Sequence, residues 1–407
     1  MSEMMNGVAA SMDNVSMEEE NTKGGNGHPN TTDVETLIVG NSAAKAADYA
    51  NYFCSYAFLY HQKQMLTDHQ RMRAYYSAVM QNKEVFQNAV VLDVGTGSGV
   101  LAAWAAMAGA KKVYAVEFTD MATHARRLVE ANGQADKVEV IKGSVEELDL
   151  AEKVDIIISE WMGYFLLRES MVDSLIKARD RFLKPDGLLF PSHATMYWAP
   201  ICFEEERLGK QQEYIQSLQE WHNFKAETKE RYGITMATLE ADYEQEQRHY
   251  YINTASWSEL HPDQVVCPPQ AIKHLDLHTC TQPEAAGVAE LPFCFPCGTQ
   301  PTRVSGFAGW FTTDFKGRVG RSLGSEVVLS TGPEAGYTHW GQQVFYLAQP
   351  LDLQPGDKIL GTFRMERQKE NIRLYDLYLT HKVKRAAPLP GNGEAEDQPV
   401  VTKYELP

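Results

Sequence analysis

Short apolar runs alternate with segments of helical period through the first half of the chain. Each run consists mostly of Val, Ile and Leu, which is typical of strands buried on both faces of a sheet. The expected strands are Val90–Val94, Lys112–Glu117, Val138–Lys142, Val154–Ser159 and 188–190, and the expected helices between them are 100–108, 121–132 and 171–182. This alternation predicts an α/β fold with a parallel sheet and helices on both faces.

The pattern differs upstream of this alternation. Residues 1–48 are rich in Ser, Asn, Gly, Glu and Met without any period, which predicts a disordered tail. Apolar residues recur every three to four positions over 51–81, which predicts helical structure leading into the sheet. We therefore expect a first folded domain over 49–190.

Pro191 and Pro200 mark the start of a second domain, which we expect over 191–407. Short alternating strands with Gly and Pro turns predict an antiparallel sheet there, and a final strand over 400–406 follows a flexible loop. Residues 203–249 interrupt these strands with a long, polar, helical segment that contains scattered aromatic residues. Such an insertion is either a solvated excursion or an arm that docks on a partner.

Composition and charge narrow the classes of function. The net charge of −16 disfavours non-specific binding to nucleic acid and would attract basic peptides. No apolar run has the length of a membrane span, and the first residues lack the basic and apolar regions of a signal peptide. The six cysteines include a single CxxC, Cys294 to Cys297, which His274 and His278 could complete as a zinc site only in the reverse of the usual order. We therefore expect no metal, and reduced thiols in an intracellular protein.

A glycine-rich loop joins the first expected strand to its helix. Asp93 precedes Gly95, Gly97 and Gly99, and glycines allow a tight turn and a close approach of a ligand to the backbone. Glu117 ends the next strand, where an acid accepts hydrogen bonds from both ribose hydroxyls of a nucleoside. No Lys-Ser/Thr follows the glycines, so a nucleoside triphosphate is disfavoured. The pattern resembles that of the class I S-adenosylmethionine-dependent methyltransferases, and a nicotinamide dehydrogenase is the competing interpretation.

The segment after the fourth strand carries the most specific chemistry. Glu160 lies at the carboxyl end of this strand, Gly163 lets the loop turn back, and Glu169 can then face Glu160. Two converging carboxylates suit a planar cation with several N–H donors, and guanidinium is that cation. Without a cation between them the two carboxylates would repel each other and strain the site. The apolar and aromatic residues between them predict a buried loop and not a solvated hairpin.

This loop, SEWMGYFLLRE, resembles the double-E loop of the protein arginine N-methyltransferases, and the similarity runs from about residue 50 to the C-terminus. Residues 52–56 resemble the opening aromatic motif of that family, and 338–340 resemble its THW loop. The resemblance implies a class I methyltransferase domain with a Rossmann-like fold, followed by an antiparallel β-barrel domain with an inserted helical dimerisation arm. Within the family, Gln62 and the sequence of the double-E loop resemble the plant type-10 branch.

The resemblance also implies roles for single residues. Arg71 is expected to pair with the methionine carboxylate of the cofactor, and Glu146 to meet its adenine amino group. His339, oriented by Asp68, is expected either to assist removal of a proton or to be a structural histidine at the domain interface. The other expected residues of the cofactor site are Tyr56, Gln62, Met65, Asp93, Gly95, Gly97, Glu117 and Met171, with Gln62 at a position where many members have His.

We expect these residues to transfer methyl groups from S-adenosylmethionine to terminal guanidino nitrogens of arginine in proteins such as histones, with Glu160 and Glu169 as the guanidinium clamp. Met65 and Glu169 agree with the branches that make monomethyl and asymmetric dimethyl products. The alternatives are a non-catalytic dimeric scaffold that binds Arg-rich tails and a class I methyltransferase that acts on a small molecule. We further expect a homodimer joined through the arm, no membrane or direct nucleic-acid binding, a role in chromatin regulation, and a location in cytoplasm and nucleus.

Overall fold

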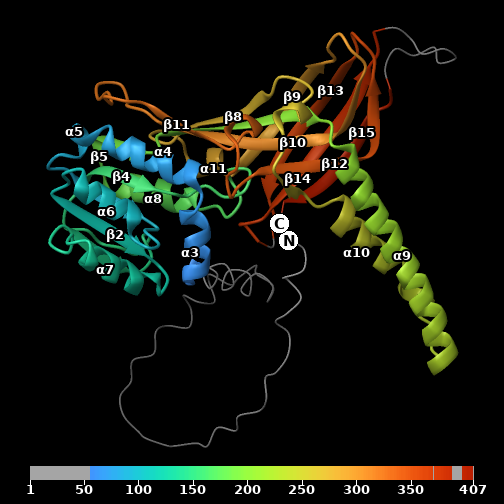
Figure 1. The fold of residues 1–407 in the computed structure, drawn as a ribbon, viewed down its shortest axis with the longest axis horizontal. Coiled ribbons are helices and arrows are strands. Elements are labelled where there is room, and N and C mark those ends of the chain that lie inside the picture. Colours follow the sequence, from blue (N-terminus) through green and yellow to red (C-terminus); the bar gives the residue numbers. More distant parts are fainter. Residues whose placement is uncertain (1–55, 370, 387–396, 407) are drawn as a thin grey trace, which may run out of the picture.

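The computed structural model describes residues 56–369, 371–386 and 397–406, and the expected disordered tail at 1–48 lies outside these residues. A domain built on a parallel sheet lies on one side of the molecule and a larger antiparallel β domain on the other (Figure 1). A pair of helices extends from the β domain away from both bodies (Figure 1). A parallel α/β domain is thus followed by an antiparallel β domain, which is the order of domains that the sequence predicts.

The parallel sheet has the strand order β3-β2-β1-β4-β5. The strands are β1 (Val90–Val94), β2 (Lys112–Glu117), β3 (Val138–Lys142), β4 (Val154–Ser159) and β5 (Leu183–Phe190). Every residue of β1 is buried, which explains its continuous apolar run. The strand order reverses between β1 and β4, so a crevice opens outside the carboxyl ends of these two strands.

Three helices follow the strands and pack on the sheet: α6 (Val100–Met107), α7 (Met121–Ala131) and α8 (Val172–Phe182). Four alanines of α6 are almost or fully buried, because a small side chain lets the helix pack closely against its neighbours. Gly99 caps α6 in the left-handed region with φ of 90°. The main difference from the expected pattern is β5, which begins at Leu183 because the polar residues 184–187 continue the strand at the edge of the sheet.

The helical structure expected over 51–81 is divided into separate helices. The chain forms α3 (Leu59–Leu66), α4 (His69–Met80) and a short α5 (Lys83–Phe86), and residues 51–55 lie outside the described part. The break falls at Asp68, whose backbone is extended and whose side chain accepts a hydrogen bond from the N–H of Arg71 at 3.0 Å. An Asp in this position is an N-cap, so the helical period continues across a point where the helix itself stops.

The β domain contains two antiparallel sheets, with the orders β7-β12-β10-β6-β8 and β15-β14-β13-β9, and β11 pairs with β10. Its strands are β6 (His193–Ile201), β7 (Ser256–Ser258), β8 (Gln270–Asp276), β9 (Gly287–Pro296), β10 (Thr302–Phe315), β11 (Val327–Ser330), β12 (Gln342–Leu353), β13 (Lys358–Arg367), β14 (Tyr375–Lys384) and β15 (Val400–Leu406). Its short helices are η2 (Pro262–Gln264), α11 (Gln282–Ala285) and η3 (Pro333–Ala335). The core between the sheets is aromatic, and Trp198 stacks on Phe307 with ring centroids 5.3 Å apart.

The insertion between β6 and β7 is a helical hairpin and not one continuous helix. Helix α9 (Glu204–Tyr232) ends at Gly233, whose φ of 68° turns the chain, and η1 (Ala237–Leu239) leads into α10 (Glu240–Ile252). Trp221 of α9 stacks on Tyr243 of α10 with ring centroids 4.3 Å apart. Among the described residues, no helix is both long enough and apolar enough to cross a bilayer.

Burial of two histidines should make the fold sensitive to acid. Burial lowers the pKa of His193 on β6 and of His381 on β14 from 6.5 to about 4. Between these pH values the unfolded chain binds protons at these two histidines that the folded chain does not. The stability that the two histidines contribute is therefore fully present above pH 6.5 and is lost as the pH falls toward 4. Each histidine should contribute up to roughly 3 kcal/mol to this loss. We expect His381→Gln to flatten the decline in the free energy of unfolding, measured by urea denaturation at several pH values from 7.5 to 4.5. An unchanged slope in the His193→Gln/His381→Gln double variant would show that the acid sensitivity has another origin.

Candidate functional site

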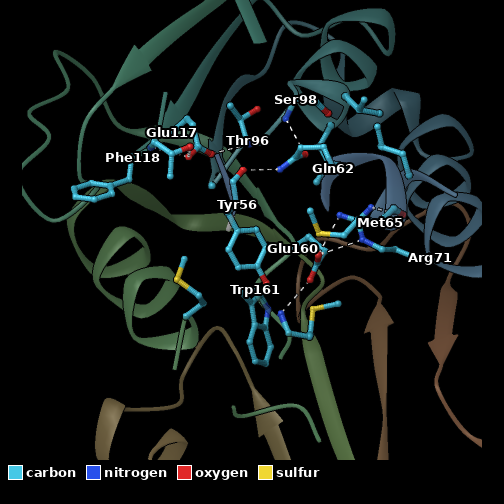
Figure 2. A pocket seen from close by; sticks show the side chains of 18 of the residues that line it. Tyr56, Gln62, Met65, Arg71, Thr96, Ser98, Glu117, Phe118, Glu160 and Trp161 are labelled. Carbon is cyan, nitrogen blue, oxygen red and sulfur yellow. Dashed lines mark hydrogen bonds and ion pairs between the residues drawn. The ribbon is translucent and has the colours of Figure 1, made fainter. Parts of the chain in front are cut away.

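A cavity of about 950 Å³, including its open mouth, lies at the carboxyl ends of β1, β2 and β4 (Figure 2). Helices α3 and α4 border it on the side opposite the sheet, and the loop between β4 and α8 closes one end. Ten of the expected site residues line it, namely Tyr56, Gln62, Met65, Arg71, Gly95, Gly97, Glu117, Glu160, Glu169 and Met171. The cavity thus brings the expected cofactor residues and the two glutamates of the double-E loop together.

The glycine loop presents its backbone to the cavity. Gly95, Gly97 and Gly99 all have positive φ values, of 72°, 53° and 90°, which a side chain would disfavour. A Cβ on Gly97 would lie 2.8 Å from Oε1 of Gln62, so the end of the Gln62 side chain would have to move. The same Oε1 accepts a hydrogen bond from the N–H of Ser98 at 3.2 Å, and Figure 2 shows Gln62 between Ser98 and Tyr56. Gln62, the residue at which the sequence departs from the family pattern, therefore packs against the glycine loop from α3.

The carboxylate of Glu117 is held in one orientation at the end of β2. Its Oε2 accepts a hydrogen bond from the N–H of Gly97 at 2.9 Å. Its Oε1 accepts from the N–H of Thr119 at 2.8 Å and from the hydroxyl of Thr119 at 2.7 Å. These bonds use most of the roughly four lone-pair sites of the carboxylate, and Oε2 can still accept a hydrogen bond from a ribose hydroxyl.

Asp93 lies beneath the glycine loop, completely buried, and is not part of the cavity lining. Burial raises the pKa of its carboxyl to about 7, although a hydrogen bond from the hydroxyl of Thr96 at 2.5 Å acts in the opposite direction. Asp93 therefore supports the turn from below. Glu146 also lies outside the lining, where its two oxygens accept hydrogen bonds from the hydroxyls of Ser144 and Ser174, both at 2.6 Å. Its expected contact with adenine stays a prediction.

Both clamp glutamates are paired with groups of the same chain. Glu160 Oε2 accepts hydrogen bonds from Nη2 and Nε of Arg71 at 3.1 and 3.2 Å, and both side chains are 10% exposed. Glu169 accepts from the hydroxyl of Tyr56 at 3.1 Å and contacts Nη1 of Arg168 at 3.4 Å. The expected strain between two unpaired carboxylates is therefore absent, because each glutamate has a guanidinium beside it. Arg71, expected on the cofactor carboxylate, instead binds Glu160 here (Figure 2).

Asp68 and His339 join the two domains next to this clamp. Asp68 Oδ2 accepts hydrogen bonds from the backbone N–H of His339 at 2.9 Å and pairs with its Nδ1 at 2.7 Å. Burial acts to raise the pKa of Asp68, but the hydrogen bonds from His339 and Arg71 outweigh it and leave the pKa below its ordinary value. Neither Asp68 nor His339 lines the cavity. His339 is therefore connected to the cavity indirectly, through Asp68 and Arg71.

Comparison with known proteins identifies the family. Residues 192–386 match the arginine methyltransferase oligomerization subdomain, and residues 91–187 match a methyltransferase domain. Protein arginine N-methyltransferase PRMT10 of Arabidopsis thaliana is 50% identical over 345 residues, which are 84% of this chain and 89% of the relative. PRMT10 of Oryza sativa subsp. japonica is also 50% identical, over 83% of this chain and 89% of the relative. The chain belongs to the protein arginine N-methyltransferase family.

Two solved structures of this family have the same fold. A crystal structure of Arabidopsis thaliana protein arginine methyltransferase 10, described as a uniquely open conformation, superposes with a TM-score of 0.83 at 47% identity and covers 88% of this chain and 100% of that one. The Trypanosoma brucei PRMT1 enzyme–prozyme heterotetrameric complex with AdoHcy gives a TM-score of 0.69 at 29% identity, over 87% of this chain and 100% of that one. The expected resemblance to the plant type-10 branch is confirmed.

The arginine methyltransferase site also contains residues that the sequence did not single out. Thr119 holds the carboxylate of Glu117, and Thr96 and Ser98 lie in the glycine loop. Trp161 and Phe118 also line the cavity. Thr119 follows the strand-ending acid by two residues, which is the spacing at which a Thr can donate back to it, so this signal was present in the sequence.

The residues that a zinc site at the CxxC would need do not come together as a ligand group. Cys294 is exposed on β9 and Cys297 is buried directly after this strand, while His274 and His278 lie beside His193. In the part of the chain that the structure describes, His, Cys, Asp and Glu side chains form no group of three that could hold a metal ion.

Removing Asp68 should weaken both a helix and a domain contact. Asp68→Ala deletes the N-cap of α4, which typically costs about 1 kcal/mol. It also leaves N–H donors of His339 and Arg71 without their acceptor, at about 1–3 kcal/mol for each buried donor. Urea denaturation should therefore show a larger loss for Asp68→Ala than for Thr281→Ala, which removes only the exposed N-cap of α11. Equal losses would show that the contact between Asp68 and His339 adds nothing to the stability of the fold.

Proposed function

We propose that the protein transfers methyl groups from S-adenosylmethionine to the terminal guanidino nitrogens of arginine side chains in proteins. One observation carries this proposal: Glu160 and Glu169 line the same cavity as the glycine loop and Glu117. The clamp already accepts a guanidinium, because Arg71 occupies Glu160 with two N–H donors. Membership of the arginine methyltransferase family supports the same substrate.

The residues at the cavity fit S-adenosylmethionine. Glu117 offers an acceptor for a ribose hydroxyl, the positive-φ glycines give access to the backbone, and Arg71 offers a guanidinium to a carboxylate. Two solved relatives contain the demethylated cofactor, as AdoHcy in the trypanosomal complex and as SAH in a PRMT6 structure. When bound, S-adenosylmethionine supplies a methyl group on a positively charged sulfur.

The chain contributes position and charge. Arginine stays protonated at neutral pH, because its pKa exceeds about 12, and a delocalised cation is a poor nucleophile. Glu160 and Glu169 would each hold one edge of the substrate guanidinium and draw its positive charge toward the nitrogens that they contact. The remaining terminal nitrogen would then have more lone-pair character, so the catalysis is mostly orientation and electrostatics.

Arg71 must leave Glu160 before a substrate guanidinium can bind there. The carboxylate of the cofactor offers Arg71 another partner within the same cavity. Once a substrate guanidinium takes the place of Arg71 on Glu160, both carboxylates again have a guanidinium partner, so the completed exchange leaves no buried charge unpaired. The pairing supports an order in which the cofactor binds before the arginine.

The type of product and the substrates are a finer part of the proposal. Met65 and Met171 both line the cavity, and flexible, unbranched side chains of this kind leave room beside the reacting nitrogen. This supports monomethyl and asymmetric dimethyl products. The net charge of −16 supports basic, Arg-rich substrates such as histone tails, and hence a chromatin role in the nucleus as well as the cytoplasm.

We also propose a homodimer in which the α9–α10 arm docks on the partner. The match to an oligomerization subdomain includes this arm. The arm projects from the body (Figure 1), and Tyr232, Ile234 and Leu239 near its tip are 71%, 55% and 45% exposed. The partner surface would be the helical back of the methyltransferase domain, where Tyr76 and Met107 are exposed. Such a contact gives a closed two-fold ring.

Replacing the first clamp glutamate should separate turnover from cofactor binding. Glu160→Gln should reduce methylation of an Arg-rich peptide by at least 100-fold, as expected for lost transition-state charge stabilisation, and leave cofactor affinity within about threefold. Glu117→Gln should do the opposite and weaken cofactor binding by about 1.5–3 kcal/mol in isothermal titration.

Tandem mass spectrometry of the wild-type product also distinguishes asymmetric from symmetric dimethylarginine by the neutral loss. Full turnover of a small metabolite, or peptide binding without any methylation, would replace the proposal with one of the two alternative functions.

Charges placed at the tip of the arm should prevent dimerisation. Ile234→Asp/Leu239→Asp would put two carboxylates into the apolar contact, and light scattering should then show monomers with little activity. Glu230→Gln, at an exposed polar position near the same tip, is the matched control and should remain dimeric. A fully active monomer would contradict the coupling of the arm to the active site.

A further inference from the structure

The second clamp glutamate has an unusual backbone. Glu169 and Ser170 have φ values of 79° and 56°, in the left-handed region that side chains with a Cβ disfavour. Phe165 and Leu166 of the same loop also have positive φ values, of 48° and 69°. A residue stays in this region only where its surroundings fix it, and such residues gather at functional sites.

The surroundings that fix Glu169 belong to the other domain. The N–H of Glu169 donates to the carbonyl oxygen of Arg373 at 2.8 Å. In return, Nη1 of Arg373 donates to the carbonyl oxygen of Glu169 at 2.7 Å. Arg373 thus binds the peptide groups on both sides of the Cα of Glu169, and these two peptide groups set the direction of the Glu169 side chain.

The neighbouring residue is held by the same segment, which connects β13 to β14. The hydroxyl of Ser170 donates to the carbonyl oxygen of Ile372 at 2.6 Å and lies 3.2 Å from the hydroxyl of Tyr375. Tyr375 in turn accepts from Nε of Arg367 at 3.1 Å. The connection between β13 and β14 is therefore hydrogen-bonded to two consecutive residues of the double-E loop, Glu169 and Ser170.

A bidentate ion pair anchors this connection to the methyltransferase domain. Nη1 and Nη2 of Arg367 each lie 2.8 Å from an oxygen of Asp173, at the start of α8. Two parallel N–H donors fix both distance and direction, so the end of β13 cannot slide along α8 without breaking the pair. The β13–β14 connection is thus held in place on the same body that carries Glu160.

We infer that Arg373 is a positioning residue for the guanidinium clamp: it fixes the left-handed backbone of Glu169, so that the β domain sets the direction of the second clamp carboxylate. This inference rests on the proposed function. Arg373 does not line the cavity, and its effect on the reaction passes through Glu169. Without it, Glu169 would relax toward an ordinary backbone conformation, and its carboxylate would turn away from the position opposite Glu160.

The test compares Arg373→Gln with Arg364→Gln, a matched control at an exposed arginine of β13 that pairs with Glu366. Arg373→Gln should lower kcat for an Arg-rich peptide by about 10- to 100-fold, the cost expected of a misplaced clamp. Cofactor affinity should stay within about twofold, since the cofactor groups do not involve the connection. Arg373→Lys should recover part of the activity, because an ammonium can still donate one hydrogen bond. Arg364→Gln should leave kcat unchanged.

A binding cycle separates positioning from a general loss of structure. Peptide affinity in the presence of S-adenosylhomocysteine should be measured for wild type, Arg373→Gln, Glu169→Gln and the double variant. If Arg373 acts through Glu169, the Arg373 substitution weakens peptide binding in the wild-type background and adds nothing when Glu169 is already Gln. Equal losses in both backgrounds, or a wild-type kcat in Arg373→Gln, would overturn the inference. If Arg373→Gln fails to fold, Arg373→Lys takes its place in the same cycle.

The cycle also distinguishes this inference from the proposed function. A wild-type protein that binds the peptide but methylates nothing would contradict the proposed function, and the binding cycle would still report on Arg373. Normal methylation with additive losses would contradict the positioning role alone.

Discussion

The burial of Phe165 is the contact on which both the site and the domain arrangement depend. Phe165 belongs to the loop of the methyltransferase domain, yet its ring lies in the β domain, with centroids 6.1–6.2 Å from those of Trp198, Phe345 and Phe363. A Cβ on Gly309 would lie 2.2 Å from this ring, so the β domain leaves space for it by omitting a side chain. Burial of a Phe side chain stabilises by about 1.5–3 kcal/mol. It also fixes the turn of the loop, and with it the separation of Glu160 from Glu169.

The β domain contributes further polar contacts around this apolar anchor. Trp340 donates its indole N–H to the carbonyl oxygen of Met162 at 2.8 Å, His339 binds Asp68, and Arg373 binds Glu169. Each of these contacts joins a residue of the β domain to a segment that borders the cavity. Although Glu160 and Glu169 lie in the first domain, the geometry of their loop is therefore a property of both domains.

Charge balance explains how the carboxylates of Glu160 and Glu169 can line the same cavity. Arg71 and Arg168 lie beside Glu160 and Glu169, so neither acid is left as an isolated buried charge. At the other end of the cavity, Gln62 similarly accepts a hydrogen bond from the N–H of Ser98, and Glu117 accepts one from the N–H of Gly97. Under the proposed function, cofactor and substrate would then exchange hydrogen-bond partners with groups that are already paired. This exchange allows a site with several charged side chains to be stable in the free protein.

The sequence by itself determined the elements whose pattern is local. The strands from Val90–Val94 to Val154–Ser159 were predicted residue for residue, because a strand buried on both faces requires a continuous apolar run. The glycine loop, Glu117 and the double-E loop were recognisable because tight turns and strand ends require particular residue types at fixed spacing. Only the tertiary structure decided what depends on partners far away in the chain. Asp68 is the N-cap at the break between α3 and α4, and its hydrogen bond to His339, 271 residues later, holds it there. The pairing of Arg71 with Glu160 and the hold of Arg373 on Glu169 join residues 89 and 204 positions apart, and no local period records contacts that form only when two domains pack together.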